Sequence, residues 1–354
     1  MFHFMLMFVG TYTRNTASEG IYAFDVNDDF SRAGLLHVNR DIDNPSWLLA
    51  HPSTGHLYSV NETGDHGGQS SGAVSAFARD DGGKLSLLGQ QASLGADPCH
   101  LAIDPGGEFL LVSNYSGGNL GTFPIGDDGV LGEFTSLVQH AGRGVDPVRQ
   151  TRAHVHSATL TRTADMCYVC DLGTDEVVSY PLAARGRVLT EGRRAHRVKP
   201  GAGPRHFCFD AGDRYGYLIN ELDNTIISFE RAEDGSLIEL ETVSALPGDY
   251  DDASYCAHIH LSSDGRFLYG SNRVHDSMVV IETGKDGQMT PRQFQPTGGS
   301  HPRHFCVSPD ERFLLVANRD SDNIVVFSRD AGTGRLTETG AVIEVPAPSC
   351  ILFV

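Results

Sequence analysis

Positive charge is scarce in this sequence. Its 354 residues carry 27 Lys and Arg against 45 Asp and Glu, which gives a formal net charge of −18. A surface that acidic repels phosphodiester backbones and anionic lipid, so we expect neither nucleic acid nor a membrane as a partner. A small anionic substrate is still allowed, because a few converging arginines make a locally positive pocket.

Long apolar segments are also missing. No segment reaches the length of a membrane-spanning helix, and no long run has helical periodicity. The apolar start "MFHFMLMFVGTYT" has no basic beginning, only a short apolar run and no clean cleavage site, which argues against a signal peptide. The sequence therefore predicts a cytoplasmic protein without sizeable helices, either a monomer or a homodimer.

Cysteine is present in an odd number, seven. Cys167 and Cys170 have the spacing of a redox motif, but they lie within a strand pattern, where residues three apart point to opposite faces. No second pair accompanies them, so zinc is not expected. The others include four that stand near the start of apolar strands after a proline, as small apolar side chains in a reduced compartment do: Cys99, Cys208, Cys306 and Cys350.

Glycine and proline, in contrast, are plentiful, with 40 and 16 residues. They punctuate a repeat of about fifty residues, the length of a four-stranded propeller blade. Each copy contains two apolar strands joined by a tight turn, then a third strand and a more polar fourth. The copies align on the polar residue that ends the second strand: Thr11, Asn61, Asn114, Asp171, Asn220, Asn272 and Asn318.

The two ends of the chain complete the count. The final "PSCILFV" looks like a first strand with nothing after it, and the initial "MLMFVGTYT" looks like a second strand with nothing before it. Pairing them closes a ring without a free inner edge. The sequence thus predicts an all-β fold, one seven-bladed β-propeller domain over residues 1–354, with its last blade built from both termini.

Polar residues bracket each hairpin. In an antiparallel hairpin the start of the first strand lies beside the end of the second, and the first strands of a propeller line its channel, so all seven brackets should meet at one mouth. Recurrent residues such as His100, and the asparagines, suit an architectural role that ties blades together. Scaffolding does not require residues that differ from blade to blade, which are His154, His156, Glu221 and Arg273.

Several motifs give these residues a context: "VGTYT" (9–13), "YSVNE" (58–62), "VSNYSGG" (112–118), "HVHS" (154–157), "GPRHF" (203–207), "INEL" (219–222), "SSDGRFLYGSNR" (262–273) and "HPRHF" (301–305). In this order and spacing the chain resembles, over essentially its whole length, the seven-bladed propeller lactonases. That family includes the propeller-type bacterial 6-phosphogluconolactonases and the fungal carboxy-cis,cis-muconate cyclases. Relatives often carry a carboxylate where this chain has His258, a departure that would change the local charge.

The resemblance implies hydrolysis of a sugar lactone, and we expect 6-phosphogluconolactone, with a catalytic set of His154, His156, Arg205, Glu221 and Arg273. Glu221 would take a proton from water and a histidine would pass it to the ring oxygen, or these roles would be exchanged. Arg205 or Arg273 would hold the oxyanion. Substrate binding would fall to further side chains at the mouth: Arg149, His206, His258, Arg303, His304 and Arg319.

Other functions stay open at this stage. A carboxymuconate cycloisomerase would use the same residues, and an unphosphorylated aldonolactone would suit the same chemistry. A non-enzymatic binding propeller would present apolar patches at the mouth, where this sequence places one tryptophan, Trp47, among many ionic groups. No Gly-x-Ser-x-Gly elbow supports an acyl-enzyme. His154 and His156 lack a third metal ligand, so we expect neither a metal nor another cofactor.

Overall fold

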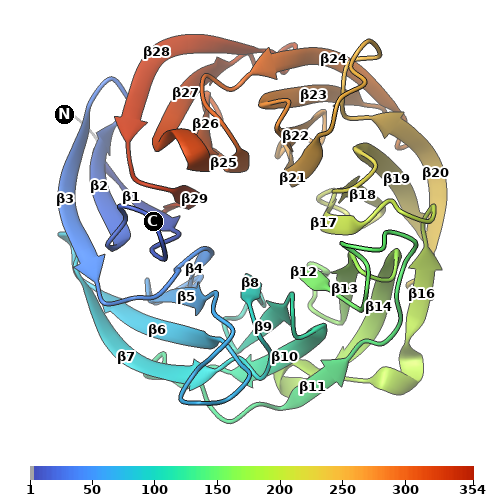
Figure 1. The fold of residues 1–354 in the computed structure, drawn as a ribbon, viewed down its shortest axis with the longest axis horizontal. Helices are drawn as coiled ribbons and strands as arrows, with labels where there is room; N and C mark the ends of the chain where they lie inside the picture. Colours follow the sequence, from blue (N-terminus) through green and yellow to red (C-terminus); the bar gives the residue numbers. More distant parts are fainter. Residues whose placement is uncertain (1–3) are drawn as a thin grey trace.

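Seven antiparallel sheets stand around a central axis as the blades of a propeller (Figure 1). The structure, a computed structural model, describes residues 4–354. Six sheets have four strands, and in the seventh two short segments, β15 (Arg187–Val188) and β16 (Arg194–Arg197), share the outer position. The predicted fold class is confirmed. No helix in the described part of the chain is long and apolar enough to span a membrane.

The strands fall into four concentric ranks. The innermost rank lines the channel and comprises β29 (Pro348–Phe353), β4 (Leu48–Ala50), β8 (Pro98–Ile103), β12 (Val155–Leu160), β17 (Pro204–Phe209), β21 (Tyr255–Leu261) and β25 (Pro302–Val307). The second rank comprises β1 (Phe4–Thr11), β5 (Leu57–Asn61), β9 (Phe109–Asn114), β13 (Met166–Asp171), β18 (Tyr215–Asn220), β22 (Phe267–Arg273) and β26 (Phe313–Asn318).

The remaining ranks lie further out. The third comprises β2 (Gly20–Asn27), β6 (Ala73–Arg79), β10 (Asn119–Pro124), β14 (Glu176–Ala183), β19 (Thr225–Arg231), β23 (Ser277–Thr283) and β27 (Asn323–Arg329). The outermost comprises β3 (Ala33–Arg40), β7 (Leu85–Ala92), β11 (Ser136–Gln139), β15 (Arg187–Val188), β16 (Arg194–Arg197), β20 (Leu237–Ser244), β24 (Met289–Pro296) and β28 (Leu336–Glu344). Three short 3₁₀ turns are η1 (Ala184–Gly186), η2 (Thr190–Gly192) and η3 (Arg319–Ser321).

The core lies between neighbouring blades. Strands β9 and β13 are buried at every position, which explains why they read as continuous apolar runs. Three buried tyrosines reach across the gap between blades: the hydroxyls of Tyr58, Tyr168 and Tyr269 donate to the carbonyls of Gly129, Gly235 and Gly334 at 2.9–3.0 Å. The repeat therefore holds its sheets together with apolar packing and with one recurrent polar contact.

The ring closes as predicted, by pairing the two ends of the chain. Strand β29 pairs antiparallel with β1, with Val9 opposite Ile351 and Phe8 opposite Leu352. The hydroxyl of Ser349 donates to the carbonyls of Gly10 and Ser46, which joins this blade to the next one. Because β1 gains a partner on both sides, the inner part of the sheet has no exposed edge.

A register shift marks the start of most innermost strands. One extra residue stands between the first paired position and the next, a β-bulge. These extra residues are Cys99, His156, Arg205, Arg303 and Ser349. A bulge interrupts the alternation of faces, which is why the consecutive side chains of Arg205 and His206 are in contact, at 3.2 Å. The bulge thereby brings the side chains of two consecutive residues of the strand into the channel.

Candidate active site

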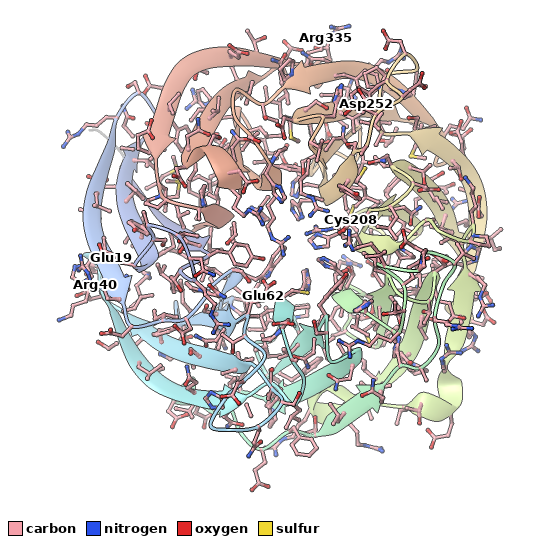
Figure 2. The ribbon with its side chains drawn as sticks, in the orientation of Figure 1. Glu19, Arg40, Glu62, Cys208, Asp252 and Arg335 are labelled. Carbon is pink, nitrogen blue, oxygen red and sulfur yellow. The ribbon has the colours of Figure 1, made fainter. Side chains whose placement is uncertain are left out.

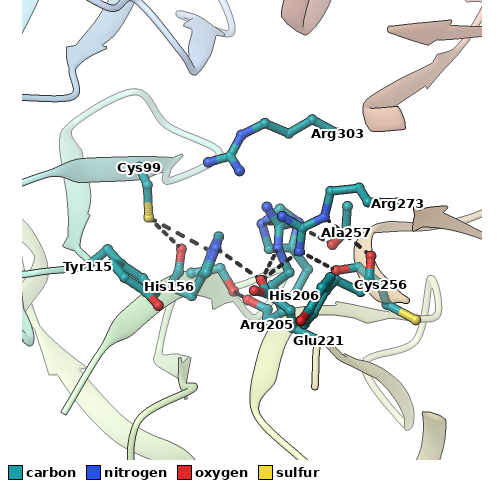
Figure 3. A network of polar contacts seen from close by, with 12 residues as sticks. Cys99, Tyr115, His156, Arg205, His206, Glu221, Cys256, Ala257, Arg273 and Arg303 are labelled. Carbon is teal, nitrogen blue, oxygen red and sulfur yellow. Dashed lines mark hydrogen bonds and ion pairs between the residues drawn. The ribbon is translucent and has the colours of Figure 1, made fainter. Parts of the chain in front are cut away.

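Glu221 is the centre of the polar cluster at the channel mouth (Figure 3). It follows the last residue of β18 and its side chain is 3 % exposed. Its Oε2 lies 3.0 Å from Arg205 Nε and 2.9 Å from Arg273 Nη2, and its Oε1 accepts a hydrogen bond from Arg149. Three guanidinium groups from three different segments of the chain therefore surround one buried carboxylate.

The charges of this cluster follow from that geometry. Burial would raise the pKa of Glu221, but Arg273, Arg205 and Arg149 outweigh it and hold the pKa well below its usual value. Burial, together with the nearby Arg273 and Arg303 charges, lowers the pKa of Arg205 to about 9, so that guanidinium stays protonated at neutral pH. Glu221 is thus ionised, and an excess of positive charge remains around it.

The three arginines differ in how far their side chains are exposed at the mouth. The side chain of Arg205 is only 2 % exposed, and its donors are directed to Glu221, His206 and the carbonyl of Ala257. Arg273 donates from Nε to the carbonyl of Tyr255 and from Nη2 to the carbonyl of Cys256, and Nη2 also pairs with Glu221. Arg149 has a side chain 34 % exposed. Arg205 therefore acts as a buried support, whereas Arg149 can touch a small molecule at the mouth.

Two histidines belong to the mouth, one next to Glu221 and one on Tyr115. His156 Nε2 is 4.0 Å from Glu221 Oε2, and burial lowers the pKa of His156 well below its usual value. His154 stacks on the ring of Tyr115, at 4.4 Å between centroids, and its Nδ1 lies 3.0 Å from the Tyr115 carbonyl. Burial lowers the pKa of His154 as well. Both imidazoles are neutral at pH 7.

The opposite side of the mouth carries a second charged group. Arg303 extends across the opening toward Cys99 in Figure 3, and its Nη2 lies 3.7 Å from Glu62 Oε1. Glu62 also accepts hydrogen bonds from the hydroxyls of Tyr12 and Ser46, and Figure 2 places it at the edge of the central opening. Arg303 lies over the ring of Tyr12 at 5.1 Å, as does Arg319 at 5.9 Å.

A cleft of about 510 Å³ opens beside Tyr12 and Arg319. Arg14 lines it as well, together with Asp320, whose carboxylate lies 2.6 Å from Arg319 Nε. Tyr12 belongs both to this cleft and to the Glu62 group at the mouth. Because Asp322 also lines the cleft, this second surface carries both arginine and aspartate side chains.

A layer of imidazoles fills the channel next to the Arg205 guanidinium. His206 Nδ1 lies 2.9 Å from His258 Nδ1, and the ring of His258 stacks on that of His304 at 4.4 Å. Trp47 packs against this layer, with its ring 4.3 Å from that of His100. Burial lowers the pKa of His100 and of His304 to about 3, and lowers those of His206 and His258 well below normal. The layer is therefore neutral.

The family model for lactonases with a seven-bladed β-propeller matches residues 6–353. The chain belongs to the seven-bladed β-propeller lactonase family. A 6-phosphogluconolactonase of Bacillus subtilis (strain 168) is 36% identical over 349 residues, which are 98% of this chain and 97% of the relative. Another, from Formosa agariphila, is 37% identical over 337 residues, covering 93% and 94%.

Solved structures agree with this assignment. A periplasmic gluconolactonase of Pseudomonas aeruginosa superposes with a TM-score of 0.92 at 32% identity, and covers 99% of both chains. The protein is accordingly a lactonase, an enzyme that hydrolyses a cyclic ester. The resemblance drawn from the motifs is confirmed, and a non-enzymatic binding propeller is no longer needed to explain the mouth.

In this lactonase the predicted site residues fall into three groups. The first contacts or adjoins Glu221 and comprises His156, Arg149, Arg205 and Arg273. The second is the neutral layer of His206, His258 and His304, which the sequence alone placed only in the same ring. The third reaches the mouth from its other parts and comprises His154, Arg303 and Arg319. Their roles are not fixed by position alone and stay predictions.

Three further residues lie at the mouth and were not among the predicted site residues. Tyr12, Glu62 and Tyr115 each follow the polar residue that ends a second strand, the same position that Glu221 and Arg273 hold in their own blades. The signal was therefore present in the repeat alignment. No group of three or more His, Cys, Asp or Glu side chains in residues 4–354 is arranged to hold a metal ion.

Proposed function

We propose that this lactonase hydrolyses 6-phosphogluconolactone to 6-phosphogluconate. The observation that carries the proposal is the arrangement of three guanidinium groups around the single carboxylate of Glu221, with the neutral His156 next to it and the neutral His154 on Tyr115. The excess positive charge suits an anionic substrate and a transition state with a developing oxyanion. The two relatives named as 6-phosphogluconolactonases support the same substrate.

Within this proposal His154 is the general base. Glu221 has too low a pKa to take a proton from water efficiently, because an effective base has a pKa near the working pH. The Tyr115 carbonyl accepts from Nδ1–H of His154, which leaves the Nε2 lone pair free. No side chain or backbone group in residues 4–354 bonds that Nε2. Glu221 then serves to hold Arg273 and Arg149 in place.

The reaction proceeds by direct attack of water on the lactone carbonyl. His154 Nε2 takes one proton as the water oxygen forms a bond to the carbonyl carbon. Arg273 stabilises the oxyanion of the tetrahedral intermediate, with the more exposed Arg149 as the second donor. Collapse of the intermediate breaks the bond to the ring oxygen, and His154 returns its proton to that oxygen. The product is a hydroxy acid, ionised at neutral pH.

The phosphate of the substrate would bind on the Tyr12 side of the mouth. Arg303 and Arg319 both lie over the ring of Tyr12, and their side chains are 15 % and 32 % exposed. The adjoining cleft adds Arg14. Guanidinium groups pair well with phosphate because two parallel N–H donors match two oxygens. We propose that this cluster selects a phosphorylated lactone over a plain one.

The test is a substrate panel with the purified protein. Hydrolysis of 6-phosphogluconolactone and of glucono-1,5-lactone is followed with a pH indicator as acid release, and cyclisation of a carboxymuconate as the proton uptake that it requires, each corrected for its spontaneous rate. The proposal expects the highest kcat/KM on the phosphorylated lactone, and loss of that activity in His154→Gln. A preference for the plain lactone would overturn the assignment of phosphate. Turnover of the carboxymuconate alone would replace hydrolysis by a cycloisomerase reaction.

A further inference from the structure

Asp171 breaks a pattern that the other complete blades keep. It ends β13 where those blades have asparagine: Asn61, Asn114, Asn220, Asn272 and Asn318. In four of them the amide Nδ2 donates to a backbone carbonyl of the connection that precedes the blade, at 2.8–3.2 Å. The asparagine there ties a blade to its neighbour. Only the blade that carries His154 and His156 has a carboxylate in this position.

The Asp171 carboxylate ends a buried chain of hydrogen bonds. Its Oδ2 lies 2.9 Å from His140 Nδ1, and His140 Nε2 lies 3.0 Å from the hydroxyl of Tyr180. The side chains of Asp171 and His140 are 0 % and 5 % exposed. The carboxylate can only accept, so Nδ1–H of His140 donates to Asp171, and this orients the other ring nitrogen toward the Tyr180 hydroxyl. All three groups are therefore satisfied without solvent.

The second oxygen of Asp171 holds the segment that bears His154. Its Oδ1 accepts from the backbone N–H of His154 at 2.8 Å and from those of Gly173 and Thr174 at 3.0 and 3.2 Å. A carboxylate oxygen that accepts several N–H donors is a stronger partner than an amide oxygen. The next residue, Leu172, donates its N–H to the His154 carbonyl at 2.9 Å. The backbone of His154 is thus bound on both sides by one turn.

Gly173 shows how tightly this turn packs. A Cβ at that position would lie 1.9 Å from the Arg152 carbonyl oxygen and 2.8 Å from the His154 nitrogen. Further along the turn, Asp175 Oδ1 accepts from Gln150 Nε2 at 2.6 Å, and Gln150 is fully buried beside Arg149. Residues 171–175 therefore hold the connection that precedes β12 at two points. One is Gln150, next to Arg149, and the other is the backbone of His154.

We propose that Asp171 is a positioning residue for His154, and that His140 and Tyr180 hold its carboxylate in place. The inference rests on the proposed function, in which His154 Nε2 is the general base. The stacking of His154 on Tyr115 fixes the plane of the imidazole, and Asp171 fixes the backbone from which it projects. A base held this way meets the attacking water at a constant distance, and small displacements of such a group cost rate steeply.

The test compares Asp171→Asn and Tyr180→Phe with the wild type and with a control, Tyr58→Phe. Asparagine has the same shape as aspartate, and its amide can donate to His140 Nδ1 when the imidazole proton is on Nε2. The fold is therefore expected to persist. Tyr58 is also a buried tyrosine, and its hydroxyl donates one hydrogen bond to the carbonyl of Gly129. It lies outside the proposed site. Thermal unfolding checks all variants, and kinetics are measured on 6-phosphogluconolactone.

We expect kcat of Asp171→Asn to fall about 10- to 100-fold, while KM changes little, because substrate contacts are untouched. Tyr180→Phe should lose about fivefold in kcat, and Tyr58→Phe should keep the wild-type value. The charged or titratable groups facing His154 are Arg149, Arg152, Tyr115 and Asp171. Removal of the one carboxylate among them should also move the acidic limb of kcat/KM to lower pH.

The outcomes separate this inference from the proposed function. If His154→Gln is inactive but Asp171→Asn keeps kcat within about twofold of wild type, the positioning role of Asp171 is wrong. The assignment of His154 as the general base then still stands. If His154→Gln retains activity, the assignment of the base fails first. Should Asp171→Asn fail to fold, Tyr180→Phe decides: a kcat equal to that of Tyr58→Phe overturns the inference.

Discussion

Replacement of Glu221 by glutamine is the most informative perturbation of this site. The substitution keeps the shape of the side chain and removes its charge. Arg205, with a side chain 2 % exposed, then loses the carboxylate that it pairs with, and so does Arg273. Removing one partner from a buried ion pair costs about 3–5 kcal/mol, because the remaining charge stays away from water without compensation. We expect the free energy of unfolding to fall by that amount.

The same change should abolish most of the catalysis. Glu221 fixes Arg273 and Arg149, the two donors proposed for the oxyanion, and loss of one such donor typically costs about 100- to 1000-fold in kcat. A matched control is Glu230→Gln, in the same blade, whose pair with Arg214 is largely exposed. An exposed pair contributes at most about 1 kcal/mol. The control should therefore retain both stability and activity.

Urea denaturation at pH 7 and kcat/KM on 6-phosphogluconolactone measure the two effects. The folded-state pKa of Glu221 is well below its usual value of 4.5. Its contribution to stability is thus complete above pH 4.5 and is lost as pH falls through the folded-state pKa. The difference between wild type and variant should be constant above that pH and shrink below it. Equal urea midpoints for Glu221→Gln and Glu230→Gln, with activity retained, would refute the reasoning.

Three further predictions follow from the same geometry. Because burial lowers the pKa of His154 from 6.5 and the base must be neutral, kcat/KM should rise with pH through a value below 6.5 and be constant at neutral pH; a limb centred above pH 7 would contradict this assignment. Arg319→Gln should raise KM for the phosphorylated lactone about 10- to 100-fold but leave KM for glucono-1,5-lactone unchanged. The control Arg335→Gln, on the outer rim in Figure 2, should change neither KM. A chain ending at residue 347 lacks β29 and exposes an edge of β1, so it should aggregate on expression, as sedimentation of the lysate would show.

Much of the fold could be predicted from the sequence because its signals are local and repeated. A polar residue ends each second strand at a nearly constant interval, and hairpin geometry alone then places the bracketing residues at one end of the channel. The pairing of the two termini followed from counting strands. Glu221, Arg205 and Arg273, which lie in two different blades, could be grouped on this basis before any coordinates.

The charges and reach of these residues could not be predicted in the same way. The bulge at Arg205 places its side chain on the same side as that of His206, so the simple alternation of a strand is misleading there. Burial then separates a hidden support, Arg205, from the exposed Arg149, although both are arginines at the mouth. Arg149 reaches Glu221 from a connection 72 residues away, a contact that no periodicity encodes.

By itself the sequence determined the number of blades, the closure of the ring and the mouth at which its polar residues gather, since each depends on spacing along the chain. Tertiary structure alone decided which of those residues are ionised, which are exposed and which hold others in place. A pKa and a hydrogen bond depend on what surrounds a group in three dimensions, as Asp171 shows: it is one more bracket residue in the repeat, yet in space it holds the backbone of His154.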